Sequence, residues 1–199
     1  MNEKTANENN DELAEKMDVL VLLSGGTDST ALVHFYKTRG NNVSGLFIDF
    51  GQISGKREGD ASELIANFYK IKLHKLKCSN INTWKSGYIP GRNAFLLHTA
   101  LMNFPSKKGI IAIGIHSGTN YVDCDHSFAI MMQQSFDLYT DGQVNLGTPF
   151  IDWKKNEIYK YSQLNGIPLH LTYSCELGKE QPCGECNSCK DLEALNAQK

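Results

Sequence analysis

An apolar run that ends in a glycine-bearing polar turn constrains this chain more than any other stretch. Residues 18–23, DVLVLL, show no alternation of apolar and polar side chains, and the run has the length of a buried strand. It is too short to span a membrane. The turn that follows, residues 24–29, has the sequence SGGTDS, and a helix-compatible segment occupies residues 30–36. The sequence therefore predicts a buried strand that leads through a short turn into a helix.

The polar turn has the chemistry of a phosphate-binding loop. Two consecutive glycines allow a tight turn and a close approach of the backbone to a ligand. Backbone N–H groups at the start of the following helix favour an anion, and a carboxylate in the turn could hold a metal ion. The candidate nucleotide-binding residues of this turn are Ser24, Gly25, Gly26, Thr27, Asp28 and Ser29. The turn lacks the lysine of a Walker A loop and the spacing of a dinucleotide-binding loop. An ordinary Gly-Gly turn between a strand and a helix is the alternative reading.

Two further apolar segments also end in polar turns. Residues 43–48 lead into Asp49-Phe50-Gly51-Gln52, and residues 110–115 lead into the polar segment 116–125. Another strand is predicted at residues 72–76. Open parallel sheets bind ligands at the carboxyl ends of their strands. With helical segments between the strands, the predicted fold is α/β, with a doubly wound, mostly parallel, Rossmann-like sheet.

Helical periodicity identifies the segments between these strands. Residues 57–69 carry four apolar side chains that we expect to face the core: Ala61, Leu64, Ile65 and Phe68. A helix is expected to begin at about Asn93, an acceptable N-cap, and to run to Met102. Residues 128–139 form another, in which Met131 and Met132 are expected to fill the core. A last helix opens at residues 154–158 and closes at Asn165-Gly166.

Length and composition set the broad class. At 199 residues the chain suits one domain or one domain with a small appendage. A formal net charge of −2 gives no sign of bulk nucleic-acid binding. No apolar run is long enough for a transmembrane helix, and the polar start does not resemble a secretory signal. We therefore expect a cytoplasmic protein without a membrane partner. We divide it into a flexible acidic tail at 1–16, a main domain at 17–170 and a C-terminal lobe at 171–199.

Four of the six cysteines form a metal-binding pattern. Cys175, Cys183, Cys186 and Cys189 have the spacing C-x7-C-x2-C-x2-C. In a reducing compartment four such thiolates suit tetrahedral zinc, and four protein ligands make a closed, structural site. An Fe–S cluster also accepts four cysteines, and two disulfides would be the reading for a secreted chain. Of the other two cysteines, Cys78 is expected to be an inert core thiol. Cys124 follows a predicted ligand-facing turn, and a role as nucleophile or substrate contact stays open.

The phosphate loop resembles that of the N-type ATP pyrophosphatases, and further motifs narrow the resemblance to the QueC family of 7-cyano-7-deazaguanine (preQ0) synthases. The matching pieces keep the family order along almost the whole chain after the tail: residues 24–29 SGGTDS, 49–52 DFGQ, 88–93 YIPGRN, 121–124 YVDC, 149–152 PFID, 155–158 KNEI and 172–175 TYSC. The phosphate loop alone identifies only the superfamily, not the family. The cysteine pattern behind the TYSC segment is the more specific feature.

This resemblance implies a fold of the adenine nucleotide α-hydrolase type, ATP and Mg2+ as reactants and a structural Zn2+. In the implied reaction ATP adenylates 7-carboxy-7-deazaguanine, ammonia converts the adenylate to an amide, and a second adenylation and dehydration give the nitrile. Asp28 would contribute to binding the phosphates and the metal ion, while Arg92 and Lys155 would add positive charge to the site. Asp49, Phe50, Gly51 and Gln52 would lie near the nucleotide. Asp123 is a candidate for reading the base or binding metal, and a homodimer is implied.

The chain also departs from the family pattern. The family usually continues its second turn as GQRH, whereas Gly51-Gln52 is followed here by Ile53-Ser54. The loops before Tyr88 and before Tyr121 are short. After Asp-Cys the family usually has RPEF, and here the sequence is DHSF, which places Asp125 where a basic residue is expected. An acidic side chain reverses the local charge beside a site for an anionic acid.

Three alternative functions follow. A QueC-like paralogue could adenylate a deazapurine carboxylate and stop at the amide, or join it to another amine on a protein or nucleic acid. A tRNA-modifying ATP pyrophosphatase is a second possibility, although thiolation would need a catalytic cysteine pair, for which Cys78 with Cys124 is a weak candidate. A tRNA ligand would also need a basic face, and the chain has 20 basic against 22 acidic residues. A nucleotide sensor that binds without producing AMP is the third.

Overall fold

The computed structural model describes residues 16–78, 87–119 and 121–196, and the predicted acidic tail lies outside them except for Lys16. The strands are β1 Asp18–Leu22, β2 Asn42–Asp49, β3 Lys72–Lys77, β4 Gly109–Ala112 and β5 Val144–Gly147. The helices are α1 Thr27–Lys37, α2 Gly55–Tyr69, α3 Arg92–Met102, α4 His126–Thr140, α5 Lys155–Leu164 and α6 Asn187–Asn196, with short 3-10 turns η1 Val122–Cys124 and η2 Leu169–Leu171.

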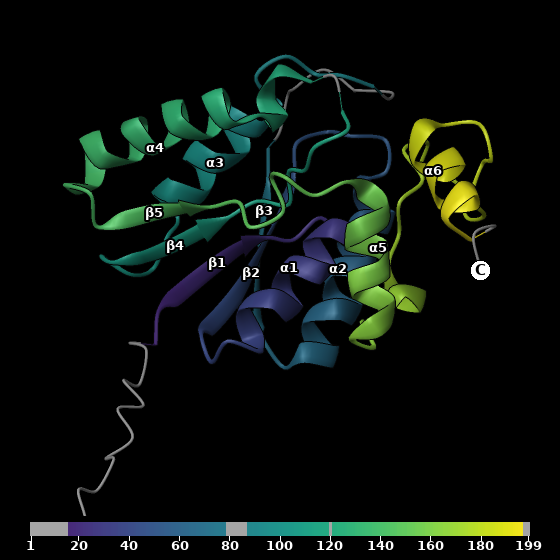
Figure 1. Cartoon of the computed structure of the whole chain (residues 1–199), viewed down its shortest axis with the longest axis horizontal. Coiled ribbons are helices and arrows are strands. Elements are labelled where there is room, and N and C mark those ends of the chain that lie inside the picture. The colour runs from purple at the N-terminus through teal and green to yellow at the C-terminus, as the bar shows by residue number, and fades with distance from the viewer. Residues whose placement is uncertain (1–15, 79–86, 120, 197–199) are drawn as a thin grey trace, which may run out of the picture.

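The five strands form one parallel sheet in the order β3-β2-β1-β4-β5, which confirms the predicted doubly wound fold. The chain moves from β1 outward to β3 and then returns to place β4 on the other side of β1. Helices α1, α2 and α5 cover one face of the sheet, and α3 and α4 cover the other (Figure 1). The carboxyl ends of β1 and β4 therefore diverge to helices on opposite faces, which is where sheets of this kind bind ligands.

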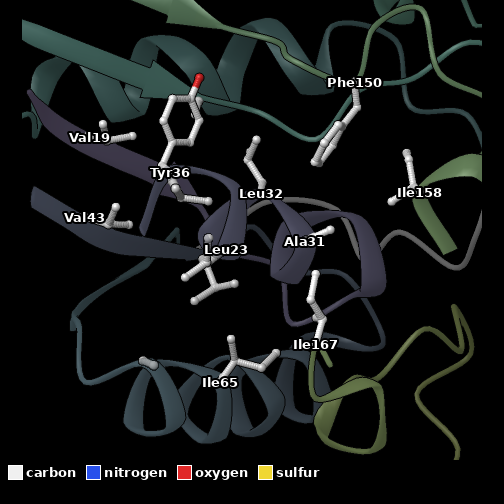
Figure 2. Close-up of a cluster of buried hydrophobic side chains, with 14 residues drawn as sticks. Val19, Leu23, Ala31, Leu32, Tyr36, Val43, Ile65, Phe150, Ile158 and Ile167 are labelled. Atoms are coloured by element: carbon white, nitrogen blue, oxygen red, sulfur yellow. The ribbon is translucent and has the colours of Figure 1, made fainter. Parts of the chain in front are cut away.

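Each face of the sheet has its own apolar core. Figure 2 shows the core beneath α1, where Leu23, Leu32 and Ile65 are fully or almost fully buried. Phe150 joins it from the segment before α5, and its ring centroid lies 5.0 Å from that of Trp153 and 5.7 Å from that of Phe35. The second core lies beneath α3 and α4. Packing in these two cores holds the strands in place, and with them the strand ends that carry the polar turns.

The predicted core face of α2 is wrong at two of its four positions. Ala61 and Ile65 are buried, but Leu64 and Phe68 are 52% and 53% exposed. Successive residues of a helix are 100° apart, and the buried face follows Ser62, Ile65 and Ala66, so Leu64 and Phe68 turn to the opposite side. A buried serine leads this face because its hydroxyl donates to the Leu23 carbonyl at 2.8 Å. Apolar spacing alone did not reveal that polar contact.

Two smaller predictions about helices are also wrong. Met132 is 2% exposed, as expected of core filler, but Met131 is 56% exposed on the outer side of α4. Helix α3 begins at Arg92 with Gly91 as its N-cap, so Asn93 is not the cap. Instead the buried Asn93 amide donates to the Asp123 carbonyl at 3.0 Å. A tertiary hydrogen bond has taken the side chain that local capping rules assigned to the helix end.

Across the part of the chain that the structure describes, no helix combines the length and the apolar character that crossing a membrane requires.

Ile65 and Leu64 give a matched test of the core face of α2. We expect Ile65→Ala to lower the free energy of unfolding by about 2–5 kcal/mol, because it leaves a cavity in a closed core. We expect Leu64→Ala to change it by about 0.5 kcal/mol or less, because this side chain is half exposed. Urea unfolding followed by circular dichroism measures both. Equal losses in the two variants would contradict the observed orientation of the helix.

Candidate nucleotide site and cysteine cluster

The phosphate loop is held between β1 and the start of α1. Gly25 has φ +79°, and a Cβ on it would lie 2.7 Å from the Glu58 carbonyl oxygen and 2.8 Å from the Ala61 Cβ. Only glycine fits where α2 packs so closely against the loop. The loop then turns directly into α1, which begins at Thr27, so Asp28 and Ser29 lie in the first helical turn.

Hydroxyl groups line the loop as predicted. The Ser29 hydroxyl donates to the Gly26 carbonyl at 3.1 Å and lies 3.2 Å from the Ser24 hydroxyl. The Gly26 N–H donates to the Ser24 hydroxyl at 3.4 Å. The N-cap residue of α1 is Gly26, and no side chain among the described residues caps the helix. Its first N–H groups are therefore free to bind an anion such as phosphate.

Asp28 is the best candidate for binding a cation. One carboxylate oxygen, Oδ2, forms an ion pair with the Lys155 ammonium at the start of α5. The other, Oδ1, is buried and has no hydrogen-bond partner among the described residues. A buried carboxylate oxygen without a partner is costly unless a ligand completes it, and Mg2+ prefers oxygen ligands. The residues present therefore fit a magnesium ion at Asp28 Oδ1.

His116 is a site residue to which the sequence prediction gave no role. Its Nε2 lies 3.9 Å from Asp28 Oδ2, and its Nδ1 lies 2.7 Å from the Ser117 carbonyl oxygen. The ring thus flanks the same carboxylate oxygen that Lys155 contacts. Its position at the head of the polar segment after β4 was the signal that could have identified it.

The second turn, at the end of β2, is closed by its own polar groups. The Gln52 side chain accepts from the Phe50 N–H at 2.8 Å and donates to the Glu58 carboxylate at 2.9 Å. Asp49 accepts from the Gly51 N–H at 3.0 Å. Because β2 lies beside β1, the turn is next to the phosphate loop. Its side chains fix the shape of this neighbouring turn.

Arg92 and Asp123 belong to a second group of predicted residues. Asn93 links them: its side-chain Nδ2 donates to the Asp123 backbone carbonyl at 3.0 Å, and its side-chain Oδ1 accepts from Arg92 Nε at 3.3 Å. Within the described ranges, no hydrogen bond or ion pair joins this group to Asp28 or Lys155. The four predicted catalytic residues thus fall into two groups, one at the head of α1 and one around Asn93.

The residues after Asp123 have structural explanations. Burial raises the pKa of the Cys124 thiol, which disfavours the thiolate that a nucleophile would need. Asp125, which replaces the basic residue expected from the resemblance, is the N-cap of α4, and its carboxylate accepts from the Phe128 N–H at 2.8 Å. His126 Nε2 pairs with Asp152 at 2.6 Å on the surface. The unusual DHSF segment therefore builds a helix start.

The four cysteines of the C-terminal lobe do come together. Their sulfur atoms all lie within 4.8 Å of one another, so the cluster could bind a metal. Burial opposes ionisation of Cys175, but hydrogen bonds from the backbone N–H groups of Cys183 and Leu177 outweigh it and lower its pKa to about 6. The sulfur of Cys183 accepts from the N–H of Cys186 at 3.3 Å. Such N–H donors stabilise thiolates, which are the form that binds metal.

The lobe docks directly on the phosphate loop. The Tyr173 N–H donates to the Gly25 carbonyl at 2.9 Å. Gly178 has φ +65°, and a Cβ there would lie 2.6 Å from the Ile53 carbonyl oxygen, so the lobe also packs against the turn after β2. At the end of the described chain, the Tyr159 hydroxyl of α5 donates to Asn196 of α6 at 2.5 Å. The cysteine cluster is thus mechanically linked to the candidate nucleotide site.

The fold defines the class first: this is an α/β protein of the adenine nucleotide α-hydrolase type with a glycine-bearing polar loop after its central strand. A family model described as queuosine biosynthesis protein QueC matches residues 18–86 and 79–197, and the chain belongs to that family.

Curated relatives agree with this assignment, and a solved structure shares the fold. A 7-cyano-7-deazaguanine synthase of Acetivibrio thermocellus is 30% identical over 197 residues, which cover 85% of this chain and 88% of the relative. A 7-cyano-7-deazaguanine synthase of Prochlorococcus marinus strain MIT 9215 is 28% identical, with 86% and 90% covered. The U34-tRNA thiolase NcsA from Methanococcus maripaludis, solved with its [4Fe-4S] cluster, shares the fold with a TM-score of 0.56. It is 17% identical, and the match covers 95% of this chain and 67% of that one.

Because the four cysteines could bind a metal, we expect the stability of the C-terminal lobe to depend on that metal. We expect the purified protein to carry one metal site per chain and Cys183→Ser to lose it, because three sulfur ligands no longer close the coordination sphere. Elemental analysis measures the metal, and thermal unfolding should shift to a lower midpoint. Cys78→Ser, outside the cluster, is the matched control and should keep the metal. Full metal content in Cys183→Ser would contradict the assignment.

Proposed function

We propose that this protein uses ATP to convert 7-carboxy-7-deazaguanine to 7-cyano-7-deazaguanine, with release of AMP and pyrophosphate. The observation that carries the proposal is the unpartnered Asp28 oxygen beside Lys155 at the head of α1, directly on the phosphate loop. It supports the binding of a metal-bound nucleotide. The name shared by the curated relatives supports the choice of acid.

The proposed chemistry begins with activation of a poor electrophile. A carboxylate oxygen of the acid attacks the α-phosphorus of ATP, and pyrophosphate leaves. The N–H groups at the start of α1 and the Lys155 ammonium stabilise the negative charge on the departing phosphates. Asp28 would hold Mg2+, which supplies further charge neutralisation at these phosphates.

Ammonia then attacks the carbonyl carbon of the acyl adenylate, AMP leaves and a proton is lost, which gives the amide. The amide oxygen attacks the α-phosphorus of a second ATP, pyrophosphate leaves again and one N–H proton is lost. Loss of AMP and of the second N–H proton forms the nitrile, so two ATP are used for each product. In this proposal Arg92, at the start of α3, adds positive charge near the acid, and Asp123 contacts the ring.

For the C-terminal lobe we propose structural zinc. A tetrahedral site with Zn–S bonds of about 2.3 Å requires sulfur atoms about 3.8 Å apart. Cys183 and Cys189 have this spacing, 3.8 Å, and all four sulfur atoms lie within 4.8 Å. In a [4Fe-4S] cluster each thiolate binds a different iron, which spreads the sulfur atoms apart. The proposal includes a reducing, cytoplasmic setting that keeps the thiols available.

A QueC-like paralogue is the second candidate, and the DHSF segment favours it. Asp125 and the His126–Asp152 pair stand where the family has basic side chains near the acid. With this change of charge the enzyme could release an amide, or transfer the activated acid to an amine on a protein or nucleic acid. The observed capping role of Asp125 weakens this argument, because it explains the aspartate without a change of substrate.

We propose that the chain forms a homodimer through the outer side of α3 and α4. Five exposed apolar side chains lie on these two helices: Phe95, Met102, Ile130, Met131 and Leu138. The helices pack together, with His98 Nε2 2.9 Å from the Ser135 hydroxyl, so their outer sides form one surface. Homodimer interfaces are apolar and poor in charge, which matches this surface.

Product analysis tests the proposed reaction. We expect mass spectrometry after incubation with ATP, Mg2+, 7-carboxy-7-deazaguanine and ammonia to show the nitrile with two AMP per product. Asp28→Asn should lower kcat/KM by at least about 100-fold, because one charged metal ligand is lost. Asp60→Asn, an exposed aspartate on α2, is the matched control and should retain full activity. An amide or conjugate as the final product would favour the paralogue. Nucleotide binding without AMP formation would favour the nucleotide sensor.

A charge on the α3–α4 surface should separate the dimer. We expect light scattering to give twice the 22.2 kDa mass of the chain for the natural sequence and the single mass for Met131→Lys. Leu64→Lys places the same charge on an exposed apolar position of α2 and should leave the mass unchanged. A monomeric natural protein, or dissociation by both variants, would contradict the assignment of this surface.

A further inference from the structure

A pair of stacked tyrosines comes from the two segments that precede Arg92 and Asp123 in the sequence. The rings of Tyr88 and Tyr121 are nearly parallel, with 19° between their planes and 5.2 Å between their centroids. Tyr88 precedes α3 and Tyr121 precedes η1, so the stack joins the segments that lead to Arg92 and to Asp123. Tyr88 is 44% exposed, so part of this aromatic surface is open to a ligand. Aromatic rings of this kind bind the faces of nucleobases.

Asp123 supplies a second, independent observation. It is only 5% exposed. Among the described residues, its carboxylate forms no ion pair and accepts no N–H or O–H hydrogen bond, and Oδ1 accepts only a long hydrogen bond from the Cys124 thiol at 4.0 Å. Burial raises the pKa of that thiol, and a thiol is a weak donor. A buried carboxylate without strong donors is costly, so a ligand that brings N–H groups would relieve it.

The position of Asp123 is fixed from the backbone. Its carbonyl accepts from the buried Asn93 amide at 3.0 Å, which ties η1 to the start of α3. The carboxylate therefore does not have to hold the local structure together. Asp123 follows β4, next to β1, so it lies on the same sheet edge as the phosphate loop, and Figure 1 places the starts of α3 and α4 at that edge.

We propose that Tyr88, Tyr121 and Asp123 form the recognition site for the ring of the acid substrate, and that this site selects heterocycles with two adjacent N–H donors on one edge. The inference rests on the proposed function, because that function supplies a ring acid as substrate. A guanine-type edge presents a ring N–H and an exocyclic amino group side by side, and both can donate to the two oxygens of one carboxylate.

The same pattern of hydrogen bonds rejects adenine, the base of the second reactant, ATP. The corresponding edge of adenine pairs an amino donor with a ring nitrogen acceptor, and an acceptor facing Asp123 would be repelled. The adenine of ATP is thereby excluded from the acid site, which keeps the two reactants apart. A site built on buried hydrogen-bonding groups can reject analogues that lack a donor by large factors.

The test compares 7-carboxy-7-deazaguanine with its analogue without the 2-amino group, 7-carboxy-7-deazahypoxanthine. For the natural protein we expect kcat/KM for AMP formation to be at least about 100-fold higher with the guanine-type acid. Asp123→Asn should reduce this ratio to below about 10, mainly by loss on the guanine-type acid. An unchanged ratio in Asp123→Asn would overturn the proposal.

Tyr88→Ala gives a test that does not depend on a buried position. Because Tyr88 is exposed, its truncation leaves the fold intact, and we expect KM for the acid to rise about 10-fold with little change in kcat or in KM for ATP. Tyr88→Phe should restore the natural KM, since it keeps the ring. Phe68→Ala, which removes an exposed aromatic ring from α2, is the matched control and should leave both KM values unchanged. Equal KM values in Tyr88→Ala and the natural protein would contradict the stacking role.

A binding experiment separates failure of this proposal from failure of the proposed function. If the natural protein forms no AMP with either acid, the function fails, but titration calorimetry with 7-deazaguanine still tests the ring site. Binding that Asp123→Asn weakens at least 10-fold would support the site. Equal binding by the two proteins, or none by either, would overturn it.

Discussion

The hydrogen bond from the Tyr173 N–H to the Gly25 carbonyl is the contact on which the rest of the site depends. Gly25 adopts φ +79° against the backbone of α2, so the phosphate loop is already confined on one side. The Tyr173 bond closes it from the other side and ties it to the segment that enters the cysteine cluster. A metal that orders the lobe would therefore also order the phosphate loop, although the metal itself would take no part in the reaction.

Electrostatics divides the sheet edge into two regions. At the end of β1, Lys155 and the start of α1 provide positive charge around Asp28, which suits the phosphates of a nucleotide. After β4, aromatic rings and the buried Asp123 carboxylate suit a neutral ring with N–H donors. In the proposed function, two reactants of different chemistry would meet at the switch point of one parallel sheet.

Much of this could be predicted from the sequence, because buried strands and tight turns leave local signals. The apolar run before Ser24 and the cysteine spacing at 175–189 are such signals, and the structure confirms the parallel sheet and the sulfur cluster. The failures at Leu64, Met131 and Asn93 share a cause: tertiary contacts decide which side of a helix is buried and where a polar side chain bonds. His116 approaches Asp28 across 88 residues of chain, so no local pattern could show the contact.

The central claim is that the phosphate loop, completed by Asp28 and Lys155, supports attack at the α-phosphorus of ATP. Phosphorus NMR of a reaction with 7-carboxy-7-deazaguanine, ammonia, ATP and Mg2+ tests it most directly, because it separates the two possible cleavages. The account predicts signals of AMP and pyrophosphate that grow together and only when the acid is present. Signals of ADP and inorganic phosphate would contradict it.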